Sequence, residues 1–278
     1  MALSVVDLYR DILPKTNCGE CGHPTCIAFA GQVVADGLSL SECPYLSAET
    51  VERCTVELKE QYAKGKWVRR DMAEDALAWA RERASNMDPA TFPARLGGKL
   101  VMEEGGPVFH LPYFSDTLRI RELTIATRTD LPLTRWEQVF ILNHLAQGGT
   151  TSPTGKWKGF IELPNTTSKI KNMVDSVEDP ISRAFSDNLL LLRERALDLG
   201  GIVETEHAGS ADIAFRFFAF PKVPVILLFW DADMDEGFEA KAKLMFDETV
   251  TDHLDIESIV FLGEELAGRL VESKPKEL

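Results

Sequence analysis

Near its N-terminus the chain reads Leu13-Pro-Lys-Thr-Asn-Cys18-Gly-Glu-Cys21-Gly-His-Pro-Thr-Cys26 and then Ser41-Glu-Cys43-Pro44, and these stretches decide the local fold. They hold four of the five cysteines in the chain, at the spacing C-x2-C-x4-C-x16-C. Three closely spaced thiolates on one loop can bind three corners of a compact cluster, and the returning chain can supply the fourth ligand. The pattern therefore predicts a [4Fe-4S] cluster held by Cys18, Cys21, Cys26 and Cys43.

The residues between the cysteines suit such a loop. Gly19 and Gly22 allow tight turns that leave backbone amides free to face sulfur atoms. Pro24-Thr25-Cys26 is typical of a helix start, where the helix dipole favours a negatively charged thiolate. Small residues follow in this helix, and Gly37 is expected to end it.

Two alternatives for the four cysteines are a structural zinc site and thiols that are unligated or disulfide-linked. Zinc sites with four cysteines usually pair two short knuckles across a longer spacer, whereas here three ligands crowd together. The fifth cysteine, Cys54, is expected to be buried in a helix, with a role as spare ligand or redox partner as the alternative. His23 is expected to lie beside the cluster without ligating it.

Composition excludes several classes of protein. The chain has 278 residues, of which 45% are hydrophobic, and its 30 basic and 44 acidic residues give a net charge of −14. That charge repels phosphate backbones and anionic membranes, and we find no basic patch, so the expected partners exclude nucleic acid. The N-terminus lacks the features of a secretory signal, and the longest apolar run, Pro224 to Trp230, is too short to span a bilayer. We expect a cytoplasmic protein without membrane insertion.

Three parts are predicted along the chain: a cluster-binding module at 1–46, a helical connector at 47–87 and a larger body at 88–278. Ser47 is expected to cap the first connector helix, with a break near Gly65. In the second connector helix, one face is expected to pack on a neighbour; it comprises Met72, Ala76, Trp79, Ala80 and Arg83.

The body mixes strands and helices without a regular βαβ rhythm, which favours an α+β fold over a doubly wound sheet. The strands are predicted at Lys99–Met102, Pro107–Leu111, Leu118–Ala126, Ala211–Phe220 and Val225–Trp230. The helices are predicted to open at Leu133–Trp136 and to run over Pro180–Leu199 and Ile256–Glu272.

Other motifs in the body carry weaker signals. Gly149 to Lys156 has the wrong glycine spacing for a phosphate loop and is expected to be a turn with exposed Lys156 and Lys158. Asp231 to Gly237 departs from a calcium loop, because its glycine is one place late and Ala242 stands at the twelfth position. His144, His207 and His253 are expected to be structural, with metal binding as the alternative, and no nucleophile and base pair is found. Residues 231–265 contribute −10 of the net charge, as a solvated face or as a docking surface for a basic partner.

The sequence also resembles known families. Residues 10–46 resemble the cluster domain of the corrinoid iron-sulfur protein large subunit and that of the RnfB electron-transport subunit, in which four cysteines at this spacing ligate one low-potential [4Fe-4S] cluster. From about Asp88 the chain resembles the uncharacterised DUF3786 domain of anaerobic bacteria and archaea. That resemblance is carried by Asn143-His144-Leu145 before Gly148-Gly149, by Pro153-Thr-Gly-Lys-Trp157 and by Phe220-Pro-Lys-Val-Pro224.

The expected function is low-potential electron transfer by an oxygen-sensitive protein of an anaerobe. Its expected partner is a redox protein, with corrinoid or one-carbon enzymes as the candidates that the resemblance implies. One alternative is an iron-sulfur enzyme whose body binds a small molecule. Another is a non-catalytic partner protein in metallocentre assembly or redox sensing. No catalytic residue is assigned.

Overall fold

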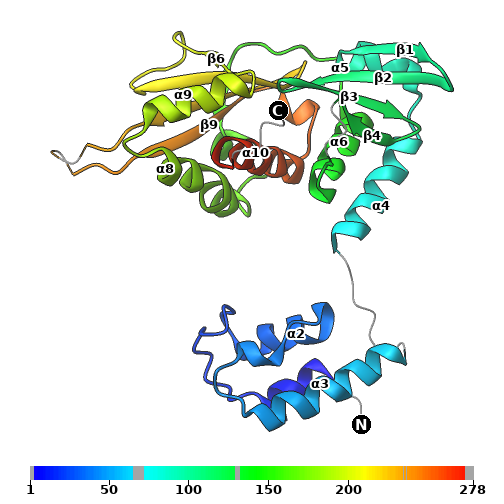
Figure 1. Ribbon diagram of the computed structural model, residues 1–278, viewed down its shortest axis with the longest axis vertical. Coiled ribbons are helices and arrows are strands. Elements are labelled where there is room, and N and C mark those ends of the chain that lie inside the picture. The colour runs from blue at the N-terminus through cyan, green and yellow to red at the C-terminus, as the bar shows by residue number, and fades with distance from the viewer. Residues whose placement is uncertain (1–2, 65–71, 129–131, 234, 236, 273–278) are drawn as a thin grey trace, which may run out of the picture. The chain divides into compact units, whose positions relative to one another are not determined.

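The chain divides between Asp75 and Ala76 into two units, and each is described by itself (Figure 1). A computed structural model describes residues 3–64, 72–128, 132–233, 235 and 237–272. The α+β class is confirmed, because a helical first unit precedes two antiparallel sheets and several helices. The three-part division at 46/47 and 87/88 stays a prediction. The expected break near Gly65 lies outside the described residues.

The first unit is built from short helices that the sequence punctuates clearly. The Ser47 hydroxyl accepts a hydrogen bond from the Thr50 amide, and Gly37 ends its helix with a φ of 70°, so both expected helix boundaries are confirmed. The elements are α1 (Val5–Asp7), the π-helical turn η1 (Leu8–Ile12), α2 (Cys26–Asp36), the 3-10 turn η2 (Leu40–Glu42) and α3 (Ala48–Ala63).

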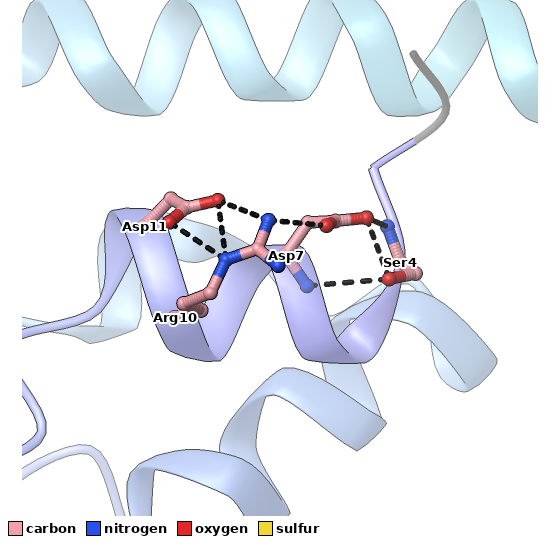
Figure 2. Close-up of polar contacts among 4 residues, drawn as sticks. All are labelled: Ser4, Asp7, Arg10 and Asp11. Carbon is pink, nitrogen blue, oxygen red and sulfur yellow. Dashed lines mark hydrogen bonds and ion pairs between the residues drawn. The ribbon is translucent and has the colours of Figure 1, made fainter.

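A capping box starts the first helix (Figure 2). The Asp7 amide donates to the Ser4 hydroxyl at 3.2 Å, and the Ser4 amide donates to the Asp7 carboxylate at 3.0 Å. Arg10 then donates to both Asp7 and Asp11, as the dashed lines in Figure 2 show. These contacts fix α1 and η1, whose Leu8 is fully buried.

One hydrophobic core joins all these helices. Helix α3 contributes Cys54 and Leu58 to the same core as Phe29 and Val33 of α2. The Tyr62 hydroxyl donates to the Val34 carbonyl at 2.6 Å, tying the end of α3 to the end of α2. Helix α3 is therefore an integral part of the first unit, together with the cysteine loop.

The second unit begins within α4 (Met72–Ser85) and continues into a four-stranded antiparallel sheet in the order β1-β2-β3-β4. The single strand predicted at Leu118–Ala126 is wrong, since two strands meet there at a turn. Glu122 and Leu123 both have positive φ, of 48° and 65°, which is the conformation of a tight hairpin turn. The elements up to this point are η3 (Pro89–Thr91), α5 (Phe92–Leu96), β1 (Lys99–Glu103), β2 (Gly106–Tyr113), β3 (Asp116–Arg121) and β4 (Thr124–Thr127).

A five-stranded antiparallel sheet follows, in the order β5-β9-β8-β7-β6. The helix predicted over Pro180–Leu199 is wrong as one element, because Asp187 takes a φ of 59° and separates α8 from α9. The helix predicted to open at Leu133–Trp136 is confirmed as α6, as are those strands predicted at β7 and β8 and the last helix, α10. The elements are α6 (Arg135–Gln147), β5 (Trp157–Gly159), η4 (Phe160–Glu162), α7 (Ile170–Met173), η5 (Val174–Glu178), α8 (Asp179–Phe185), α9 (Leu189–Asp198), β6 (Ile202–Val203), β7 (Ile213–Phe220), β8 (Val223–Trp230), β9 (Lys241–Asp247), η6 (Val250–Asp252) and α10 (Ile256–Val271).

The main core lies between one face of the larger sheet and the helices. Phe215, Leu227 and Leu244 from three adjacent strands share this core with Leu262 of α10. The predicted packing face of α4 is partly wrong, because Ala80 is buried but Trp79 is 55% exposed. Leu77 and Ala84 take its place, and the side chain of Met72 lies outside the described residues.

A buried ionic network fixes α6 against α10. The Glu137 carboxylate, 2% exposed, accepts hydrogen bonds from the Tyr113 hydroxyl at 2.9 Å and from Arg269 at 2.6 Å. Arg269 also pairs with Glu265 on its own helix. Since every charge here has a partner, the network holds β2, α6 and α10 in one arrangement.

Among the described residues, no helix combines the length and the apolar composition that a membrane span requires.

Candidate functional site

The first two cysteines lie in a glycine-rich turn. Gly19 and Gly22 have φ values of 77° and 79°, and the Gly22 amide donates to the Gly19 carbonyl at 2.9 Å. A Cβ at Gly22 would meet nothing within 4 Å, so glycine is needed there for its backbone conformation and not for space. Cys18 is exposed and Cys21 is half-buried on this turn.

The third cysteine opens α2, as the sequence predicted. The Thr25 hydroxyl caps this helix by accepting a hydrogen bond from the Ala28 amide at 3.2 Å. The Cys26 amide donates to the Asn17 side-chain oxygen at 2.8 Å, and Asn17 itself has a φ of 50°. Asn17 therefore connects the residue before the first cysteine to the third cysteine, a role not predicted from the sequence.

The fourth cysteine follows η2 and is 6% exposed. Its amide donates to the Leu40 carbonyl at 3.2 Å, and its own carbonyl accepts from the Leu46 amide at 3.3 Å. Burial raises the pKa of the Cys43 thiol, and negative charge on Cys21, Cys26 and Cys18 acts in the same direction. The four thiols thus lie within electrostatic range of one another.

The donor set suits a metal cluster by its chemistry. All five cysteines of the chain are free, and four sulfur donors are the ligand set of both iron-sulfur clusters and structural zinc. In the part of the chain that the structure describes, no three His, Cys, Asp or Glu side chains are closed into the geometry of a metal site. The four thiols are therefore gathered in one region, and ligation would require them to move closer together.

Cys54 and His23 take no part in this group of thiols in the way that a ligand would. Cys54 is 1% exposed inside α3, as expected for a packing residue, and burial raises the pKa of its thiol. The His23 ring packs beside Phe29, with the ring centroids 5.7 Å apart. Both observations agree with the supporting roles that the sequence predicted.

A contact between the two cysteine-bearing segments was not predicted from the sequence. The Tyr45 hydroxyl donates to the Glu20 carboxylate at 2.5 Å. No periodicity or motif marks this pair, because the two residues lie 25 positions apart and both are exposed.

Residues 149–156 form a loop whose amides are occupied by a carboxylate of the chain itself. The Thr154 and Gly155 amides donate to Asp247 at 3.2 and 2.7 Å, and Thr249 donates to the same side chain. An anion already sits where a phosphate would have to bind, so the rejection of a phosphate loop is supported. Lys156 is exposed as expected, whereas Lys158 is half-buried on β5.

The structure brings two of the three candidate histidines together. His144 and His253 are both fully buried, with ring centroids 6.0 Å apart, while His207 lies elsewhere, beside Glu204 and Trp157. His144 donates from Nδ1 to the His253 carbonyl, and His253 donates from Nε2 to the Thr151 carbonyl. Because a carbonyl can only accept, these contacts assign the tautomer of each ring.

Burial sets the protonation state of this pair. It lowers the pKa of His144 to about 3 and also lowers the pKa of His253. The His144 ring stacks on Phe220 at 4.3 Å between centroids. The pair is therefore a neutral, packed element between α6 and the loop before α10.

The acidic turn after β8 makes local contacts in place of a calcium loop. Asp231 accepts from the Asp187 and Ala232 amides, at 2.8 and 2.9 Å. Asp233 bridges to Phe238 through the backbone and accepts from the Asp235 amide at 3.0 Å. Residues 234 and 236 of this stretch lie outside the described residues.

We expect Asn17→Gly to loosen the start of α2. Glycine tolerates the positive φ of this position, so the change removes the hydrogen bond to the Cys26 amide without adding strain. Losing it costs about 1 kcal/mol, which corresponds to about five-fold faster amide exchange at the first turn of α2 in the metal-free full chain. Asn17→Asp keeps the acceptor and should exchange as the wild type does. Equal exchange rates in Asn17→Gly and the wild type would contradict the role given to Asn17.

Comparison with known proteins divides the chain at the same two regions. Residues 13–45 match the family described as "Putative Fe-S cluster", and residues 88–269 match the family described as "Domain of unknown function (DUF3786)". Both resemblances drawn from the sequence are thereby confirmed. No solved structure matches the chain.

Curated relatives match only the N-terminal region. The corrinoid/iron-sulfur protein large subunit of Moorella thermoacetica is 51% identical over 47 residues, which is 17% of this chain and 10% of the relative. The acetyl-CoA decarbonylase/synthase complex subunit gamma 1 of Methanosarcina thermophila is 54% identical over 46 residues, 16% of this chain and 10% of the relative. One component of the ion-translocating oxidoreductase complex of Vibrio vulnificus is 41% identical over 49 residues, 18% of this chain and 24% of the relative.

The extent of these matches fixes what they mean. The chain spans about a tenth of the length of the first curated relatives, so the likeness concerns the cysteine-bearing region alone. The match to residues 88–269, in contrast, covers more than half of the chain. The protein therefore belongs to the DUF3786 family.

Proposed function

We propose that Cys18, Cys21, Cys26 and Cys43 bind one [4Fe-4S] cluster, and that the protein transfers low-potential electrons to a redox partner protein in the cytoplasm of an anaerobe. The observation that carries the proposal is the gathering of four free thiols by one glycine turn, one helix start and one returning segment. The match of residues 13–45 to an iron-sulfur family supports it. When bound, such a cluster supplies one-electron transfer.

Zinc is the main competing ligand, and the arrangement of the thiols favours iron. Three of the four thiols come from one loop and the start of α2, whereas a four-cysteine zinc site usually takes two ligands from each of two knuckles. The positive φ at Gly19 and Gly22 shapes a turn whose amides can donate to sulfur. Asn17 holds the Cys26 amide, so this part of the loop keeps its shape without metal.

The exposure of the thiols indicates where electrons would pass. Cys26 and Cys43 are buried, but Cys18 is exposed on the turn. A partner protein can therefore approach the Cys18 side closely, as electron transfer between proteins requires. The names of the curated relatives include corrinoid and acetyl-CoA decarbonylase/synthase subunits, which supports a corrinoid or one-carbon enzyme as the partner.

Anaerobic purification tests the proposal directly. We expect a coloured protein with about four iron atoms and about four acid-labile sulfides per chain, and an EPR signal of a reduced cluster with a midpoint potential of about −400 mV or lower. A colourless protein that binds one zinc ion and takes up no iron and sulfide on reconstitution would overturn the proposal. A cluster with a midpoint potential near 0 mV would overturn the low-potential role.

A further inference from the structure

One side-chain contact joins the segment of the fourth cysteine to the turn of the first two. The Tyr45 hydroxyl donates to the Glu20 carboxylate at 2.5 Å, the distance of a strong hydrogen bond to a charged acceptor. Glu20 lies between Cys18 and Cys21, and Tyr45 lies two positions after Cys43. We name this contact the Tyr45–Glu20 clasp.

No other hydrogen bond does the same work among the described residues. The bonds within residues 39–46 are local: Glu42 to Ser39, Cys43 to Leu40 and Leu46 to Cys43. Asn17 joins the first and third cysteines but does not reach the fourth. Between residues 17–26 and 39–46, the clasp is the one hydrogen bond that the described part of the chain makes.

The clasp acts on Cys43 through the backbone of Tyr45. The Tyr45 amide donates a hydrogen bond to the Cys43 sulfur, while the hydroxyl of the same residue is anchored on Glu20. Fixing the side chain of Tyr45 therefore fixes the direction of its amide. Amide hydrogen bonds to ligand sulfur atoms are one of the factors that set the potential of an iron-sulfur cluster.

Exposure makes a purely structural role for this contact an incomplete account. The Tyr45 side chain is 54% exposed, and an exposed hydrogen bond contributes little to the stability of a fold. Cys43 beneath it is 6% exposed. What the contact does is to hold a surface aromatic residue in one orientation directly beside the fourth thiol.

We propose that Tyr45 and Glu20 are positioning residues, which hold Cys43 against the Cys18–Cys21 turn and aim the Tyr45 amide at its sulfur. This inference rests on the proposed function where the cluster is concerned. Its prediction for the metal-free chain, in contrast, concerns the accessibility of Cys43 alone.

The first test uses the metal-free full chain under reducing, anaerobic conditions. A short pulse of iodoacetamide is followed by mass spectrometry of each cysteine. In Tyr45→Phe, which keeps the ring and removes the donor, Cys43 should be modified about five-fold faster than in the wild type. Glu20→Ala should give the same increase, and the double variant should add nothing further. Cys54, buried in α3, is the internal reference for global unfolding.

A matched control and a second measurement complete the design. Tyr9→Phe is the same substitution in the same unit and should leave the modification rate of Cys43 unchanged. After reconstitution, Tyr45→Phe should keep its iron but release it to a chelator several-fold faster, with a shifted midpoint potential.

The outcomes separate the two proposals. Wild-type protein that takes up no iron overturns the proposed function, and the modification rates still decide whether the clasp holds Cys43. Iron-loaded wild-type protein whose Cys43 reactivity, iron release and potential are all unchanged by Tyr45→Phe and by Glu20→Ala overturns the clasp. Additive effects of the two substitutions would also overturn it, because they would show that the residues act separately.

Discussion

Cys26→Ala is expected to lose most of the iron and sulfide bound by the wild type, while Cys54→Ala keeps both. The two cysteines make a well-matched pair, because they lie in the same core of the first unit and are 7% and 1% exposed. Each substitution removes one buried sulfur atom, so each costs a similar amount of packing energy, on the order of 1 kcal/mol. A difference between them in bound iron therefore reports ligation and not stability.

Bound iron and acid-labile sulfide are measured after anaerobic reconstitution of the full chain, and circular dichroism checks that both variants remain folded. Cys18→Ala extends the comparison to an exposed position, where no packing is lost. It should lose iron as Cys26→Ala does. Equal iron in Cys26→Ala and Cys54→Ala would contradict the assignment of Cys26 as a ligand.

Acid should destabilise the second unit through its buried histidine pair. Burial holds the pKa of His144 at about 3, below the ordinary value of 6.5 that the unfolded chain has. Above about pH 6.5 both states are neutral at this residue, so it adds no pH dependence. As the pH falls below 6.5, the unfolded chain binds a proton that the folded chain does not, and stability is lost. The loss approaches about 1.4 kcal/mol per pH unit and could total about 5 kcal/mol by pH 3.

Urea unfolding followed by tryptophan fluorescence between about pH 7.5 and pH 4.5 measures this slope, since α4, α6, β5 and β8 of the second unit carry tryptophan. His144→Asn offers a side-chain amide near the position of Nδ1, which can donate to the His253 carbonyl without titrating. This variant should be less stable at neutral pH, because it loses the stacking on Phe220, but its stability should fall less steeply in acid. Some slope should remain, because burial also lowers the pKa of His253. The same slope in the variant and the wild type would show that His144 is not responsible.

Local signals in the sequence were enough to predict much of the first unit. Cysteine spacing, a serine before α3 and a glycine after α2 each act over a few residues, and the structure confirms the helix boundaries they indicated. The exposed phenol of Tyr45 and the carboxylate of Glu20 left no such signal. Their contact depends on how two segments return to one another, which only tertiary structure decides.

In the second unit, the errors occurred where a backbone conformation interrupts a favourable pattern. Residues 118–126 have the composition of one strand, yet Glu122 and Leu123 form a turn without glycine or asparagine. Asp187 interrupts a helix-favouring stretch in the same way. The pairing of His144 with His253 joins residues 109 positions apart, and each acceptor is a backbone carbonyl, so residue types alone could not predict it.

The Asp247 carboxylate also bears on the order in which the chain can fold during synthesis. The loop at 149–156 is held by this residue, and β5 pairs only with β9 within the described sheet. Both partners are synthesised about ninety residues later than the loop they organise. The loop and β5 must therefore wait, without their final contacts, until β9 has emerged from the ribosome, whereas the first unit has all of its cysteines and its whole core available long before.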